Sequence, residues 1–105
     1  MSEEEFGLQF TLDSGQTWTF NSLPIWMGRD GQNEIVIPDD TVSAVHAQVY
    51  YDDLVGDICI QDLDSLNGLL LGDLPTRKNV LQDGIRIGLG KARLIFRDTG
   101  YIHVG

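Results

Sequence analysis

The sequence has little of several things, and each shortage excludes a class of protein. It contains a single cysteine, Cys59, so no internal disulfide can form. No apolar run approaches the roughly 18–20 residues that a membrane-spanning helix needs, and the acidic start, residues 1–5, is not followed by the apolar core of a secretory signal. We therefore expect a cytoplasmic protein with no membrane insertion. Cys59 lies between Ile58 and Ile60, a position typical of a packed, reduced thiol.

Positive charge is also scarce. The 105 residues include 7 Lys and Arg against 16 Asp and Glu, a formal net charge of −9 at pH 7. Nucleic acids and anionic membranes bind through clustered cations that face their phosphates, so this balance argues against both as partners. Net charge describes only the average field, and a small local anion site remains compatible with it. Apolar residues make up 42% of the chain, enough for a packed core.

The hydrophobic pattern has a period of two. Apolar and polar residues alternate over several short runs, of which 8–12, 45–51 and 92–96 are the clearest. Turn residues interrupt the runs at a spacing of about 8–12 residues, which predicts an all-β sandwich or barrel. We expect Trp18 and Trp26 in its core. The pattern indicates one domain over residues 1–105, with its core at about 8–97 and frayed ends at 1–5 and 100–105. It leaves open whether this domain stands alone or belongs to a larger multidomain protein.

The patterns of catalytic and metal sites fit this sequence poorly. Ser43 and His46 suggest a nucleophile with its base, but residues three apart in a strand point to opposite faces, and no Gly-x-Ser-x-Gly turn surrounds the serine. His46, His103 and Cys59 do not make a convincing zinc set. Residues 88–92 lack phosphate-loop spacing and are typical of a hairpin turn. We expect no enzyme, no metal site and no cofactor, and a small hydrolase using Ser43 and His46 is the rival hypothesis.

Polar residues gather where predicted strands run into loops. Arg29 follows the predicted strand 24–27, Ser43 follows the loop 38–42, and Asn67 lies in a turn after the predicted strand 58–63. A sandwich brings alternate loops together at one end. There, a guanidinium fork, a hydroxyl and an amide would form a clamp for an oxyanion and a peptide backbone. Each residue also has a structural interpretation: an ion pair for Arg29, a backbone cap for Ser43, and an ordinary turn for Asn67.

Five segments combine in an order that resembles a known family. Gly-Arg at 28–29 is followed by Asn-Glu-Ile-Val-Ile-Pro-Asp at 33–39, Val-Ser-Ala-Val-His-Ala at 42–47, Asp-Leu-Asp-Ser-Leu-Asn-Gly at 62–68 and Leu-Gln-Asp-Gly-Ile-Arg-Ile-Gly at 81–88. Together they resemble the forkhead-associated (FHA) domain over roughly residues 8–97. The resemblance implies a β-sandwich of about eleven strands, of the SMAD/FHA type, whose loops at one end bind phosphothreonine peptides.

The resemblance also implies roles for individual residues. By position, Arg29 and Ser43 would contact the phosphate, and Asn67 would hydrogen-bond the main chain of the ligand. Four further residues would support the loops: Gly28, His46, Ser65 and Gly68. The implied partner is a phosphothreonine-bearing protein or peptide, with phosphothreonine preferred to phosphoserine because its methyl group fills a small pocket.

Two positions depart from the family pattern. Ala44 stands where Arg, Lys or Asn is common, and Leu66 stands where Thr is common. Neither side chain can donate a hydrogen bond, and each missing charge-assisted contact is worth about 1.5–3 kcal/mol. Arg77, Lys78 and Lys91 are the cations that a neighbouring loop offers as replacements. These departures favour an alternative function, an FHA domain that joins proteins independently of phosphorylation.

Overall fold

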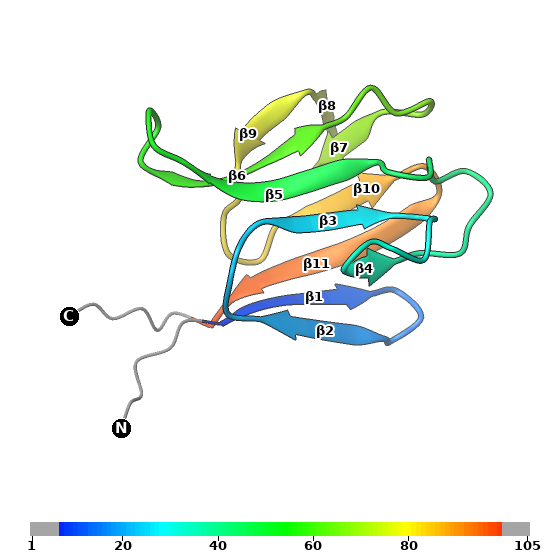
Figure 1. Ribbon diagram of the computed structural model, residues 1–105, viewed down its shortest axis with the longest axis horizontal. Coiled ribbons are helices and arrows are strands. Elements are labelled where there is room, and N and C mark those ends of the chain that lie inside the picture. Colours follow the sequence, from blue (N-terminus) through cyan, green and yellow to red (C-terminus); the bar gives the residue numbers. More distant parts are fainter. Residues whose placement is uncertain (1–6, 100–105) are drawn as a thin grey trace.

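The structure is a computed structural model that describes residues 7–99, and over this range it contains eleven strands and no helix. One sheet holds six strands: β1 (Leu8–Leu12), β2 (Thr17–Phe20), β7 (Leu69–Leu71), β8 (Leu74–Thr76), β10 (Arg86–Leu89) and β11 (Ala92–Asp98). The other holds five: β3 (Ile25–Gly28), β4 (Ile35–Val36), β5 (Ala47–Asp52), β6 (Asp57–Asp62) and β9 (Lys78–Val80). The predicted all-β sandwich of about eleven strands is confirmed (Figure 1). The predicted frayed ends, 1–5 and 100–105, lie outside the described residues.

The order and direction of the strands determine which loops lie together at each end of the sandwich. The six-stranded sheet has the order β2-β1-β11-β10-β7-β8 and the five-stranded sheet the order β4-β3-β5-β6-β9. In the part of the chain that the structure describes, only β3 and β4 pair in parallel. The loops after β3, β4 and β10 lie at one end of the sandwich, and the β5–β6 turn lies at the other (Figure 1). Within residues 7–99 there is no helix long and apolar enough to cross a membrane.

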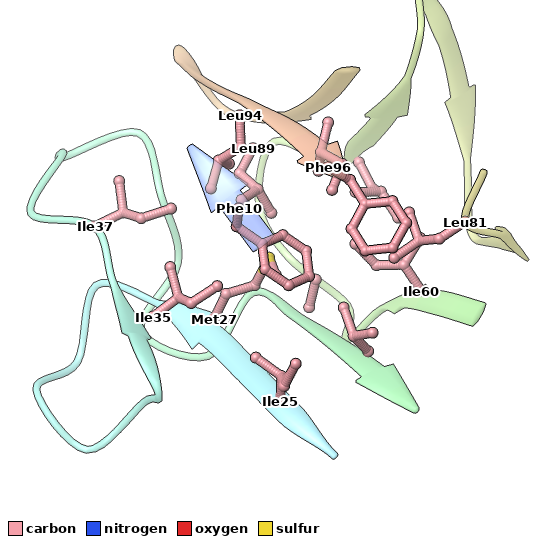
Figure 2. Packing of buried hydrophobic residues seen from close by; sticks show 14 of the residues in the cluster. Phe10, Ile25, Met27, Ile35, Ile37, Ile60, Leu81, Leu89, Leu94 and Phe96 are labelled. Atoms are coloured by element: carbon pink, nitrogen blue, oxygen red, sulfur yellow. The ribbon is translucent and has the colours of Figure 1, made fainter. Parts of the chain in front are cut away.

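The core lies between the sheets, where the period of two places it. Phe10 and Phe96 are opposite each other in register and pack with ring centroids 5.2 Å apart. Ile25 and Met27 face them from the other sheet (Figure 2). All four are at most 1% exposed. Burying a side chain of this size contributes about 1.5–3 kcal/mol, so the alternating residues of both sheets hold the sandwich together.

The predictions for Cys59 and for the two tryptophans had different outcomes. Cys59 is 1% exposed, as predicted, and burial raises the pKa of its thiol. The prediction that Trp26 belongs to the core was wrong, because its side chain is 36% exposed. Ile25 and Met27 point inward on β3, so the pleat turns the residue between them outward whatever its size. Trp18 is half-buried and packs against the core.

Candidate binding site at the loop end of the sandwich

A buried histidine joins two of the loops at this end. His46 has no exposed surface. Its Nδ1 accepts a hydrogen bond from the Ser43 amide (3.1 Å), so the ring proton resides on Nε2, which donates to the Gly68 carbonyl (2.7 Å). Asp62 Oδ1 lies 3.9 Å from Nε2, too far for a hydrogen bond. His46 therefore fixes the loop before β5 to the turn before β7.

The expected geometry of Ser43 and His46 was wrong in one respect. Both residues lie in the loop before β5 rather than in a strand, so they do contact each other. The contact uses the Ser43 amide. The Ser43 hydroxyl oxygen instead accepts a hydrogen bond from the Leu66 amide (3.0 Å). His46 is thus turned to the serine backbone, and the hydrogen bonds do not form a nucleophile–base pair.

Gly28 lets the loop before β5 pack directly on β3. The Arg29 amide donates to the Ser43 carbonyl (2.9 Å), and the Asp30 amide donates to the Ala44 carbonyl (3.0 Å). A Cβ at Gly28 would lie 2.3 Å from the Ala44 oxygen, closer than any side chain allows. The exposed Arg29 follows at once, and its Nη1 donates to the Val42 carbonyl (2.7 Å). Among the described residues, this bond uses one of the five guanidinium N–H groups of Arg29.

The turn that carries Asn67 is built by Ser65. The Ser65 hydroxyl donates to Asp62 Oδ1 and accepts from the Gly68 amide (2.8 Å), while Gly68 adopts a φ of 81°. The Asn67 Nδ2 then donates to the Thr41 carbonyl (2.8 Å). Its amide oxygen and second N–H are not engaged by the turn, so the residue can bridge the loop and still contact a ligand.

The structure brings the three predicted ligand residues to one strip of backbone. Arg29 donates to the carbonyl of residue 42, Asn67 donates to that of residue 41, and Ser43 belongs to the strip itself. The bond from the Leu66 amide uses only an oxygen lone pair of Ser43, and the Ser43 O–H donates to no other residue of the range 7–99. One cationic fork, one hydroxyl and one amide therefore face a common loop end, which is the set of donors that an oxyanion on a peptide requires.

Two residues of this network were missed by sequence reasoning. Asn33 is 9% exposed, and its Nδ2 donates to the Asp30 (2.7 Å) and Ala44 (2.8 Å) carbonyls. The Thr41 hydroxyl donates to Asp39 Oδ1 (2.6 Å) and accepts from the Lys91 amide (2.7 Å). The bonds from Thr41 lower the pKa of Asp39. Asn33 stood in the quoted pattern without a role, whereas no sequence signal distinguished Thr41.

The departures from the pattern lie on the surface of the site. Ala44 is exposed, and Leu66 is 88% exposed. Of the possible replacement cations, Arg77 shares a groove of about 470 Å³ with Leu66 and Asn67 and pairs with Asp64 (3.2 Å). Lys91 reaches the site through its backbone, as described above. Lys78 instead binds Asp52 and lies over Tyr50, so its charge is directed along the sheet, away from the site.

Comparison with known proteins decides the family. Residues 25–90 match the FHA domain. The chain belongs to the FHA domain family. Over 90 residues, 86% of its length, this FHA domain is 34% identical to the oxoglutarate dehydrogenase inhibitor of Corynebacterium efficiens and 35% identical to the glycogen accumulation regulator GarA of Mycolicibacterium smegmatis. It spans about half the length of these curated relatives, 56% and 51% respectively.

A solved structure shows the same fold. It comes from a structural and functional analysis of phosphothreonine-dependent FHA domain interactions, and it superposes with a TM-score of 0.79 at 28% sequence identity. The match covers 94% of this FHA domain and 99% of that chain. Among residues 7–99 of the FHA domain, no group of three or more His, Cys, Asp and Glu side chains could hold a metal ion. His103 lies outside the described residues.

Proposed function

We propose that this FHA domain is a non-catalytic interaction module that binds phosphothreonine-containing peptides. Arg29 and the Ser43 hydroxyl hold the phosphate, and Asn67 holds the peptide main chain. The observation that carries the proposal is the convergence of these three side chains on residues 41–43. The phosphothreonine-dependent interactions named for the similar structure support it. The partner is a cytoplasmic phosphoprotein, and the regulatory names of the curated relatives support a regulatory role.

The site is prepared before the ligand arrives. His46 and Asn33 hold the loop before β5 from beneath, and Ser65 shapes the turn that presents Asn67. A phosphate dianion therefore meets donors whose backbone is already fixed, so little conformational entropy is lost on binding. Each charge-assisted hydrogen bond contributes about 1.5–3 kcal/mol, enough for two of them to set the phosphate dependence.

The test is an NMR titration of the labelled domain with a degenerate phosphothreonine peptide library, with the unphosphorylated library as control. We expect amide shifts at Arg29, Ser43 and Asn67 with the phosphorylated pool alone. Phosphoserine peptides should bind more weakly. The variant Arg29→Ala should lose the response while the thermal midpoint changes little, because the exposed side chain makes one backbone contact. Unchanged binding together with a large loss of stability would make Arg29 a structural residue.

A second candidate function rests on Ala44 and Leu66. Both lie exposed beside the proposed ligands and offer no donor, so the phosphate would receive fewer bonds than the family pattern provides. The alternative is an interaction domain that binds its partner independently of phosphorylation. Silence at Arg29, Ser43 and Asn67 up to millimolar phosphopeptide would establish this alternative in place of the first.

A further inference from the structure

Two arginines lie side by side on the outer face of the six-stranded sheet. Arg86 of β10 is in register with Ile95 of β11, and Arg93 of β11 is in register with Gly88. Residues that oppose each other across a strand pair share a face, and Ile95 shares it with Arg93 because they are two apart. The arginines are therefore diagonal neighbours, about 7–8 Å apart at the backbone. We call this surface the arginine face.

The guanidinium of Arg93 lies against the sheet, in the space left by Gly88. A Cβ at Gly88 would lie 3.0 Å from Arg93 Nη1 and 3.2 Å from Cζ, so the glycine leaves the space that the fork occupies. Nη1 donates to the carbonyls of Gly90 (2.7 Å) and Ala92 (2.9 Å). These bonds hold the fork in one place and leave its other donors unused by the turn.

Within residues 7–99, neither arginine of this face has a carboxylate partner. Among the described residues, ion pairs occupy Arg77, Lys78 and Arg97, but none involves Arg86 or Arg93. This is unexpected in a chain with 16 acidic residues and only 7 Lys and Arg. These two cations repel each other and together produce a local positive field. The net charge of the whole chain, in contrast, is negative. The local positive field attracts an anionic group.

The shape of the face selects among anions. A depression of about 240 Å³ is lined by both arginines together with Thr11, Asp13 and Ile95. Ile95 is half-buried and offers an apolar contact between the two cations. The Asp13 carboxylate on the rim repels a phosphate dianion more strongly than a single carboxylate. A guanidinium fork binds a carboxylate in bidentate fashion. The depression lies along strands β10 and β11, the direction in which an extended chain would follow it.

We propose that the arginine face is a docking surface for an acidic segment of a partner protein, one in which a Glu or Asp stands two positions from an apolar residue, so that in an extended chain both side chains point to the same face. The carboxylate binds between Arg86 and Arg93, and the apolar side chain packs on Ile95. None of these residues belongs to the proposed phosphopeptide site. The face can therefore act whether or not that site is filled, and a partner would be held at two separate points.

The probe is a short unphosphorylated peptide in which glutamate and leucine take turns at every second position, with serine between them, titrated into the labelled domain and followed by NMR. We expect saturable shifts at the amides and side-chain Nε–H signals of Arg86 and Arg93 and at the Ile95 amide. The counterpart peptide with glutamine in place of glutamate should leave them unmoved. Arg86→Gln, an exposed position without hydrogen-bond duties in the described structure, should weaken binding at least fivefold.

Matched variants separate charge from structure. Arg97→Gln removes a charge from the same strand and face, but Arg97 is paired with Asp83 (Nε–Oδ1, 3.5 Å), so we expect almost unchanged binding. Arg93→Lys keeps the charge and loses the fork, and an intermediate loss should follow. Thermal midpoints of all variants show that the sandwich is intact.

Several results would overturn the proposal. Equal binding of the glutamine peptide would show that the carboxylate charge of the peptide does not contribute to binding. An unaltered titration of Arg86→Gln would remove the arginine pair from the contact. Inorganic phosphate that moves the same signals when the acidic peptide does not would make the face a phosphate site. Shifts that grow with protein concentration alone would make the occupant a second copy of this chain.

Discussion

At the scale of single residues, His46 has the largest structural consequence. Its ring is buried and makes hydrogen bonds to two different loops. The variant His46→Ala would leave a cavity and two backbone groups without partners, so we expect the free energy of unfolding to fall by about 2–4 kcal/mol. Urea denaturation measures this, with Gln48→Ala, a half-buried outward position on β5, as the control. An unaltered midpoint for His46→Ala would show that its hydrogen bonds are dispensable.

Leu66 offers the opposite experiment, a gain of function. Because its side chain is 88% exposed, Leu66→Thr should leave the fold intact. If the hydroxyl then reaches the phosphate, one added charge-assisted bond of about 1.5 kcal/mol raises phosphopeptide affinity roughly tenfold. Isothermal titration with a single phosphothreonine peptide measures the change. Leu74→Thr, at an exposed leucine on β8, is the matched control and should change nothing. Equal affinities of Leu66→Thr and the parent would place the phosphate away from this turn.

Single residues also show where sequence reasoning reached its limit. Arg29, Ser43 and Asn67 could be grouped from the sequence because each lies where predicted strands run into loops and each matches a position of the FHA pattern. Thr41 could not be, since its three contacts join Asp39, Asn67 and Lys91 across three loops. Such a hub depends on how loops approach in space. A threonine in a loop has the same local pattern whether it binds one neighbour or three.

At the scale of elements, the alternation of apolar and polar residues predicted the strands but did not predict where they end. The two sheets and their core follow from the period of two. The alternation of residues 45–51 begins before β5, yet residues 43–46 form a loop. The Arg29 and Asp30 amides and Asn33 Nδ2 bind the backbone of this loop, and Gly28 leaves room for it. This is why Ser43 and His46 meet rather than point apart. The pattern of neighbouring residues in the sequence cannot predict a loop that is stabilised by residues more than ten positions away.

The β5–β6 turn gives a prediction about pH. Asp52 accepts a hydrogen bond from Lys78 of β9 and from the Val55 and Leu54 amides, and the Lys78 bond is the main cause that lowers the pKa of Asp52. Asp52 in turn raises the pKa of Lys78. A lowered carboxyl pKa stabilises the fold above the unfolded value of about 4, and that stability is lost as pH falls. A raised lysine pKa stabilises the fold below about 10.5, and that stability is lost at higher pH.

The variant Asp52→Asn isolates this charge, because an amide oxygen can still accept from the turn amides. We expect a lower thermal midpoint than that of the parent between about pH 5 and pH 10, with the difference shrinking towards pH 2. Thermal scans across this range measure it, and Asp53→Asn, an exposed neighbour without an ion pair among the described residues, is the control. A difference that persists undiminished at pH 2 would show that the effect is not due to the ion pair.

At the scale of the whole molecule, the net charge of −9 opposes the proposed ligand. A phosphate dianion approaches the site through a repulsive average field and is attracted once it is close to Arg29. Salt screens the long-range field, with a Debye length of about 10 Å at 0.1 M, more than it screens contacts inside the site. We therefore expect the association rate of a phosphothreonine peptide with neutral flanks to rise several-fold between low and physiological salt. Stopped-flow fluorescence measures this rate, and a peptide with lysine flanks should show the opposite slope. If both peptides slow down as salt is added, the local cations around Arg29 dominate the field that the ligand meets, and the acidic surface is too distant to matter.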